Sequence, residues 1–250
     1  MGTTRRTFIG GIAAAFAAQA TRGAEKLETP LLRLGIVSDS HCKVLHDPDN
    51  KKTWGPQSTA ALQNALTKFR EWGVDAVVHP GDFTEYGTLS ELEATGISWR
   101  RAFPDGKDAF GNPVEKLFVR GNHDKMGKDA DIDLLIRKDP AKAWKDVFGI
   151  DWYDRIMVRN VKGYVFILVD WDTTAAELDA FFVEHGADLP KDRPFFYVQH
   201  SAPAGTIGAN PSATLGGCSK YLKNYPNCIA LSGHSHDSIT LGDQTWQGDF

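Results

Sequence analysis

Five segments of the chain that are typical of β-strands are each followed by residues that commonly bind metal ions. Apolar and β-branched residues run through these segments, which predicts strands. In α/β sheets, ligands gather at the edge where parallel strands end. The pattern therefore restricts the chain to a layered α/β fold with one polar edge. The five segments are residues 31–38, 74–79, 115–120, 194–200 and 227–232.

Helices are expected between these strands, together with one pair of strands joined by a tight turn. Ser58 is expected to cap a helix over 59–72, because apolar residues recur there on one helical face. With 250 residues, the chain is long enough for one α/β domain with a sizeable core. The other expected helices lie over 89–103, 129–147 (broken) and 174–185, and the strand pair over 153–160 and 164–170.

The first 24 residues are typical of a targeting signal rather than of a folded segment. Arg5 and Arg6 precede a mildly apolar stretch, no acidic residue occurs before Glu25, and small residues at 18 and 20 fit a cleavage site. The block resembles a twin-arginine export signal. This resemblance implies an exported protein, periplasmic or extracellular, with an export signal over 1–24 and one domain over 25–250.

The charge balance excludes a general nucleic-acid binder. The chain has 28 basic and 32 acidic residues, a net charge of -4, and loss of residues 1–20 leaves 26 against 32, or -6. Such a chain repels polyanions, so no nucleic-acid polymer is expected as a partner, and a phosphorylated substrate would need a local cationic site.

No apolar run approaches the roughly 18 residues of a membrane span. Cys218 and Cys228 are close enough in sequence for a disulfide, and three free thiols fit equally well.

Two of the polar blocks contain a pair of possible ligands separated by one residue. Asp39 and His41 form one pair, and His234 and His236 form the other. On an extended segment, such residues point to one side and can hold one ion. Asp82 follows a glycine after another strand, and its two carboxylate oxygens could bridge two cations.

The remaining blocks add a neutral ligand and a possible proton donor. Asn122 offers an amide oxygen, His123 can donate a proton, and Asp124 is expected to fix the tautomer of His123. His200 ends a strongly apolar strand. Each block alone is more often an ordinary polar turn or strand end.

Taken together and in this order, the blocks resemble the calcineurin-like metallophosphoesterase family. Its pattern, D-x-H, then G-D, G-N-H-D/E, H and G-H-x-H, occurs here between residues 34 and 236. The resemblance implies a four-layer α/β-β/α sandwich, in which two packed mixed sheets are flanked by helices. It also implies further strands of the second sheet beyond Phe250.

The resemblance further implies a two-metal hydrolase acting on a small phosphorylated substrate, with divalent or trivalent Mn, Fe or Zn ions. Asp82 would bridge the ions, and a metal-bound hydroxide would attack phosphorus in line. His123, helped by Asp124, would stabilise the developing charge or protonate the leaving oxygen. One ion would be held by Asp39, His41 and His236, and the other by Asn122, His200 and His234.

Some features separate the chain from relatives or leave its substrate open. Purple acid phosphatases use a tyrosine three residues after the G-D aspartate, where this chain has Glu85, so no tyrosinate–iron centre is expected.

Phosphomonoesters and phosphodiesters both fit the pattern. A non-catalytic metal- or phosphate-binding protein on the same fold is the alternative, and the fold alone does not exclude hydrolysis of another bond. Substrate contacts are expected from loops 41–56, 89–113 and 201–219, including Trp54, Trp99, Arg100 and Arg101.

Overall fold

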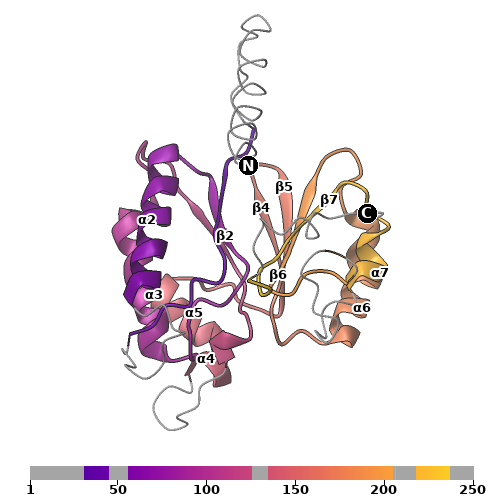
Figure 1. Ribbon diagram of the computed structural model, residues 1–250. Coiled ribbons are helices and arrows are strands. Elements are labelled where there is room, and N and C mark those ends of the chain that lie inside the picture. Colours follow the sequence, from indigo (N-terminus) through magenta and orange to yellow (C-terminus); the bar gives the residue numbers. More distant parts are fainter. Residues whose placement is uncertain (1–30, 45–55, 126–134, 205, 207–217, 237–250) are drawn as a thin grey trace, which may run out of the picture. The chain divides into compact units, whose positions relative to one another are not determined.

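Two β-sheets form the centre of the described chain (Figure 1). The computed structural model describes residues 31–44, 56–125, 135–204, 206 and 218–236. The first sheet is parallel with strand order β1-β2-β3, and the second has the order β4-β5-β6-β7, with only β4 antiparallel to its neighbour. The strands are β1 (Leu34–Ile36), β2 (Ala76–His79), β3 (Glu115–Phe118), β4 (Ile156–Val161), β5 (Tyr164–Val169), β6 (Phe195–Gln199) and β7 (Cys228–Leu231).

Helices cover the outer face of each sheet, which confirms the four-layer architecture predicted from the sequence. Helices α2, α3 and α5 pack on the first sheet, and α6 and α7 pack on the second (Figure 1). The α-helices are α2 (Pro56–Trp72), α3 (Leu89–Ala102), α4 (Leu135–Lys138), α5 (Pro140–Phe148), α6 (Ala175–His185) and α7 (Ser219–Leu222). Short 3-10 turns are η1 (Pro104–Gly106), η2 (His123–Lys125) and η3 (Gly186–Asp188).

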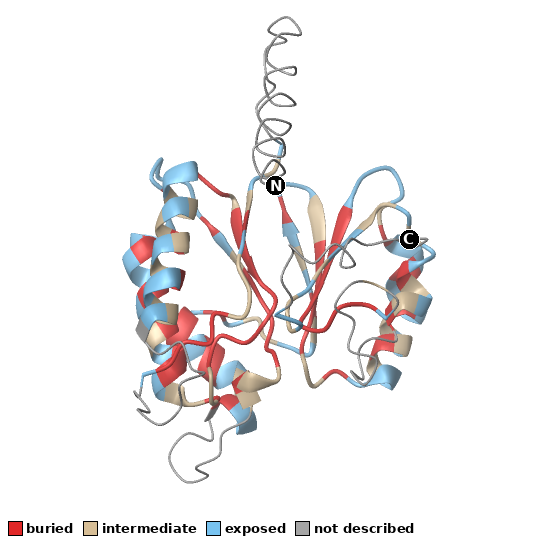
Figure 2. Ribbon diagram, in the orientation of Figure 1, coloured by how far each residue is buried: buried red, intermediate tan, exposed pale blue. Residues whose placement is uncertain are grey.

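Three apolar layers hold the sheets and helices together (Figure 2). Strand β2 is buried on both faces, because Val77 points to the helices while Ala76 and Val78 face the second sheet. Leu117 of β3 and Leu168 of β5 belong to this inter-sheet layer. The alternation of side chains along a strand therefore buries these strands between two layers.

Local sequence signals set the starts of two of the longer helices. Thr88 and Thr174 begin α3 and α6 with capping boxes, in which the threonine and a glutamate three residues later satisfy each other's backbone N–H groups. The predicted Ser58 cap is wrong, because α2 already begins at Pro56. The Ser58 hydroxyl instead donates to the carbonyl oxygen of His41 (2.9 Å) and ties the helix to the loop after β1.

Several sequence predictions lie outside the described residues, among them the export signal, Trp54 and most of the loop between 201 and 219. Of the described helices, none is long and apolar enough to cross a membrane. Cys42, Cys218 and Cys228 are free thiols, so the structure has no Cys218–Cys228 disulfide. In the stretch expected as a broken helix, the described part forms α4 and α5, separated by Asp139.

Candidate metal centre

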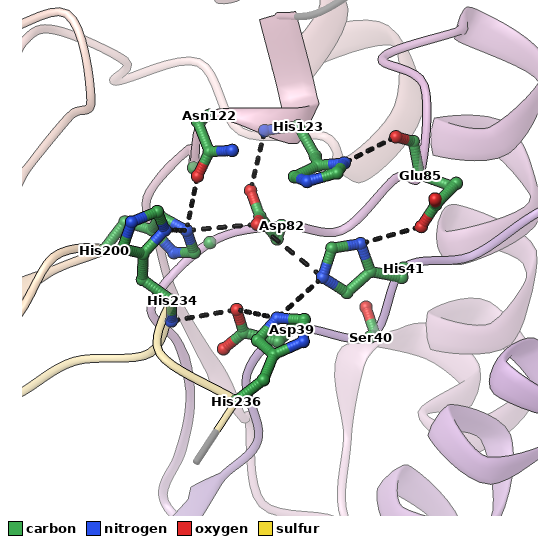
Figure 3. Close-up of polar contacts among 12 residues, drawn as sticks. Asp39, Ser40, His41, Asp82, Glu85, Asn122, His123, His200, His234 and His236 are labelled. Atoms are coloured by element: carbon green, nitrogen blue, oxygen red, sulfur yellow. Dashed lines mark hydrogen bonds and ion pairs between the residues drawn. The ribbon is translucent and has the colours of Figure 1, made fainter. Parts of the chain in front are cut away.

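The polar residues predicted from the strand ends come together at one place between the two sheets (Figure 3). From the first sheet, Asp39, Asp82 and Asn122 follow β1, β2 and β3. From the second sheet, His200 follows β6 and His234 follows β7. Since β1 to β3 are parallel and β5 to β7 are parallel, their carboxyl ends bring these residues to the same edge.

A first cluster joins the pairs from the β1 and β7 loops. Ligand atoms of Asp39, His41, Asp82 and His236 all lie within 4.8 Å of one another. His236 Nε2 lies 3.0 Å from His41 Nε2 and 3.1 Å from Asp39 Oδ1. The His41 ring is buried and His236 is half exposed, so the cluster has a buried and an open side.

A second cluster lies on the other side of Asp82. Atoms of Asp82, His200 and His234 again lie within 4.8 Å of one another. His200 Nε2 is 3.1 Å from Asp82 Oδ2, 3.2 Å from His234 Nδ1 and 3.0 Å from Asn122 Oδ1. Asp82 thus belongs to both clusters.

The chemistry of this donor set fits two transition-metal ions. His200 Nε2 faces three polar atoms within 3.2 Å, and two ring nitrogens of His41 and His236 face each other. A neutral imidazole nitrogen carries either one hydrogen or one lone pair, so direct hydrogen bonds satisfy only part of these contacts. Converging imidazole nitrogens, carboxylates and one amide oxygen suit a transition-metal ion better than Ca²⁺.

The backbone is left-handed at five of the seven candidate metal ligands, which was not predicted from the sequence. Asp39 and His41 were expected on an extended segment, as were His234 and His236, and this expectation is wrong. Five of the seven non-glycine residues with positive φ in the described chain belong to the site. Strain of this kind costs about 1–3 kcal/mol per residue and is typical of functional sites. The five are Asp39 (52°), His41 (40°), Asp82 (56°), His234 (78°) and His236 (54°).

Two glycines allow the loops to approach each other closely. A Cβ at Gly121 would lie 2.1 Å from Asp82 Oδ1, and one at Gly233 would lie 2.1 Å from Asp39 Oδ2. Both aspartates therefore occupy space that any side chain at the glycine would fill. The glycines of the G-N-H-D and G-H-x-H blocks keep the two carboxylates in place.

His123 and Asp124 do not form the pair that the sequence suggested. The Asp124 carboxylate accepts hydrogen bonds from the backbone N–H groups of Gly121, Asp82 and Thr84, at 2.8–3.0 Å, and from the Thr84 hydroxyl. It joins the β2 and β3 loops instead of contacting the His123 ring. Burial and the nearby Asp82 charge raise the pKa of Asp124 to about 6, although these hydrogen bonds favour its charged form.

Glu85 contacts both histidines beside Asp82 and was missed as a site residue. Its carbonyl oxygen accepts a hydrogen bond from His123 Nδ1 (2.7 Å), which fixes the tautomer of that ring. Its carboxylate lies 3.0 Å from His41 Nδ1, on the side of the ring away from His236 (Figure 3). Carboxylates often orient metal-binding histidines in this way. The available signal was its position three residues after Asp82.

His79 is buried and supports the β1 and β2 loops. Burial lowers its pKa to about 3, so the ring is neutral at pH 7. Nδ1 lies 3.3 Å from the N–H of Gly81 and accepts its hydrogen, which leaves Nε2–H to donate to the Ser40 hydroxyl (3.0 Å). The ring also stacks on Phe83, with centroids 3.7 Å apart.

Arg120 lies next to the site, and the sequence analysis overlooked it. Its side chain is 2% exposed and makes a two-point contact with Asp170, at 2.7 and 2.9 Å. It also donates to Asp172 Oδ2 (2.8 Å) and to the Tyr153 hydroxyl (2.9 Å). Burial opposes its charge, but the hydrogen bonds and charge of Asp170 raise the pKa of Arg120 above its ordinary value.

Two of the expected substrate contacts on α3, Trp99 and Arg100, are engaged elsewhere. Trp99 is 4% exposed in the core, and Arg100 donates to the carbonyl oxygen of Val147 (2.8 Å). A cavity of about 520 Å³ instead lies beside the first cluster, lined by Asp39, His41 and His236 together with residues of α2. Helix α2 therefore borders the open space next to the candidate ligands.

Comparisons with known proteins agree with this geometry. The family model of the calcineurin-like phosphoesterases matches residues 32–238. The fold is similar to a dimetal phosphatase from Danio rerio, with a TM-score of 0.59 and 13% identity over 83% of this chain and 82% of that chain. It is also similar to a purple acid phosphatase from yellow lupin (Lupinus luteus) seeds, with a TM-score of 0.53 and 15% identity over 81% of this chain and 37% of that chain.

No curated protein matches the chain. At 13% and 15% identity, the two solved structures show a shared fold. The family match carries more weight, because it extends from before β1 to beyond His236 and so includes every residue of the two clusters. The chain belongs to the calcineurin-like phosphoesterase family and is a metal-dependent phosphoesterase.

Proposed function

We propose that this protein is an exported hydrolase of phosphomonoesters or phosphodiesters that uses two transition-metal ions, Mn, Fe or Zn. The observation that supports this most strongly is the position of Asp82. Its carboxylate oxygens lie within 4.8 Å of the ligand atoms of both clusters. In this proposal Asp82 would be a ligand shared by both ions. The first ion would be held by Asp39, His41 and His236, and the second by Asn122, His200 and His234.

When bound, the two ions would polarise the phosphoryl oxygens and lower the pKa of a water molecule at the site. The chain itself must then hold the ligands and keep their charges balanced. Asp39 and Asp82 are the two carboxylates of the proposed ligand set, and the imidazoles and the Asn122 amide add no negative charge. The loaded site would therefore be cationic within a chain of net negative charge and would attract a phosphate group.

His123 is the residue that we propose as the proton donor. Its backbone N–H donates to Asp82 Oδ1 (2.9 Å), and its Nδ1–H donates to the carbonyl oxygen of Glu85 (2.7 Å). Both bonds fix the ring beside the clusters and leave Nε2 available. The proposed role needs the imidazolium form of His123, because Nδ1–H already holds the proton of the neutral ring. In that form Nε2–H can donate to a phosphoryl oxygen or transfer its proton to the leaving oxygen, which leaves the ring neutral.

Two variants separate metal binding from catalysis. In His123→Ala, we expect two Mn²⁺ ions per chain to remain and turnover to fall by about 10²–10⁴-fold, the usual contribution of a positioned proton donor. In Asp82→Asn, we expect both ions to be lost together. Metal content by elemental analysis and hydrolysis of p-nitrophenyl phosphate and bis-p-nitrophenyl phosphate measure these effects. His185→Ala, on the partly exposed end of α6, is the matched control.

Two results would contradict the proposed roles. Wild-type turnover by metal-loaded His123→Ala would exclude His123 as the proton donor. Two tightly bound ions in Asp82→Asn would exclude Asp82 as the bridge. The ratio of diester to monoester hydrolysis in the wild-type protein defines the substrate class.

The proposed export is supported by the sequence of residues 1–24, in which Arg5 and Arg6 precede an apolar stretch and a cleavage pattern. Replacement of both arginines by lysine keeps the charge and removes the twin-arginine pair. We expect this variant to stay in the cytoplasm of a bacterial host. An antibody against the protein, used on cytoplasmic and periplasmic fractions, measures its location. Equal export of the variant and the wild-type chain would contradict the twin-arginine route.

A further inference from the structure

The two halves of the candidate metal site lie on different sheets. Asp39, His41, Asp82 and Asn122 follow strands of the first sheet, whereas the three remaining ligands follow β6 and β7. The sheets meet through an apolar layer that includes Ala76, Val78, Leu117 and Leu168, among others. Apolar burial is non-directional, so a polar contact across this layer adds a restraint on orientation that burial alone does not supply.

Arg120 supplies a directional contact between the sheets at the edge of the site. It follows β3 of the first sheet, and its partner Asp170 follows β5 of the second. Nε and Nη2 of Arg120 bind the two oxygens of Asp170 at 2.9 and 2.7 Å, and both side chains are at most 2% exposed. Tyr153 also donates to Asp170. A two-point guanidinium–carboxylate contact fixes orientation as well as distance.

Both ends of this contact continue directly into the site. Arg120 is followed by the Gly121–Asp124 block, which carries Asn122 and His123. Asp170 accepts hydrogen bonds from the backbone N–H of Asp172 (2.9 Å), and its carbonyl oxygen accepts from Thr173 (3.0 Å). This turn carries Trp171, whose ring centroid lies 5.6 Å from those of His200 and His234.

We propose that Arg120 is a positioning residue that sets the spacing between the two halves of the metal site through its buried contact with Asp170. This inference rests on the proposed two-metal function. Arg120 touches neither cluster, and it acts through the loop that carries Asn122 and through the turn that packs Trp171 on His200 and His234. A shift of either sheet would move the ligands of the second ion apart.

A buried ion pair is weak evidence for a role in stability. Replacement of such a pair by apolar residues is often neutral or stabilising, whereas removal of one partner leaves a buried charge. Stability and positioning can therefore be separated experimentally. The double variant Arg120→Met/Asp170→Leu removes both charges and keeps apolar volume, and Arg120→Lys keeps the charge but loses the planar fork.

The test compares Mn²⁺ binding and folding in these variants. We expect the double variant and Arg120→Lys to unfold cooperatively in urea and to bind Mn²⁺ at least about tenfold more weakly than the wild-type protein, as observed for residues that orient metal ligands. Electron paramagnetic resonance supplies a second readout. Its signature of magnetic coupling between two Mn²⁺ ions depends on their spacing, and we expect that signature to weaken in both variants.

The control is Arg193→Lys, which alters an exposed ion pair with Asp192 just before β6, at the opposite end of that strand from His200. It should bind Mn²⁺ like the wild-type protein. Wild-type affinity and an unchanged coupling signature in either folded Arg120 variant would overturn the inference. Failure of the wild-type protein itself to bind two ions would instead refute the proposed function, so the two failures are distinguishable.

Discussion

Replacement of Gly121 by alanine tests whether the spacing around Asp82 controls metal binding. The new Cβ would lie 2.1 Å from Asp82 Oδ1, 2.6 Å from Asp82 N and 2.8 Å from Asp82 Cγ. Real Cβ atoms essentially never lie closer than 3.0 Å to such neighbours, so Oδ1 must retreat by about 0.9 Å. Asp82 is 1% exposed, and the surrounding packing leaves it little room.

This displacement affects two functions of the same carboxylate. Oδ1 accepts the backbone N–H of His123 at 2.9 Å, and loss of that bond costs about 1–3 kcal/mol of stability if the N–H is left without a partner. Asp82 is also the proposed bridge between the ions. A misplacement of about 1 Å can lower turnover about 10²-fold, so we expect a loss of at least that size together with weaker Mn²⁺ binding.

Isothermal titration with Mn²⁺ and hydrolysis of bis-p-nitrophenyl phosphate measure the two effects. Gly106→Ala is the control, because its Cβ meets nothing within 4 Å while its φ of +69° adds backbone strain. The control should lose about 1–2 kcal/mol of stability and keep Mn²⁺ affinity. If Gly121→Ala binds two Mn²⁺ ions with wild-type affinity and turns over normally, the steric reasoning about Asp82 is wrong.

Three other predictions concern metal loading, Trp171 and a helix cap. Mn²⁺ at about 100 times its dissociation constant should raise the free energy of unfolding by about 2.7 kcal/mol. Urea titration with and without chelator measures this effect. An unchanged urea midpoint would contradict binding of Mn²⁺ to the folded state. Mn²⁺ should quench tryptophan fluorescence in the wild-type protein but much less in Trp171→Phe, since this indole packs on His200 and His234; equal quenching would refute that placement. Thr88→Ala should lower the free energy of unfolding by about 1 kcal/mol through loss of the α3 cap, and Mn²⁺ binding should not change. Equal urea midpoints for this variant and the wild-type protein would refute the role of the cap.

The positions of the strands along the chain and the meeting of the polar blocks could be predicted from the sequence. Apolar runs that are followed by Asp39, Asp82 or His200 predict buried strands with a polar residue after their carboxyl ends. Parallel pairing of such strands brings these ends to one edge of a sheet. This reasoning uses short segments only. It succeeded because each block contains its own strand and its own polar end.

The detailed geometry of the site could not be predicted in the same way. The left-handed φ of Asp39 and His41 depends on the loops packed against them, since residue type alone favours negative φ for both. The Arg120 contact joins residues 50 positions apart, and a lone arginine before Gly121 gives no signal of its partner. Asp124 looked like a partner of His123, yet the three backbone N–H groups that it binds come together only in the folded chain.

The most direct test of the two-metal account is a titration of metal-free wild-type protein with Mn²⁺, in which bound ions and hydrolysis of a chromogenic phosphoester are followed together. The account predicts two ions per chain, with turnover rising as the second ion binds. Two bound ions in a folded protein without turnover, or full turnover in the presence of chelator, would contradict it.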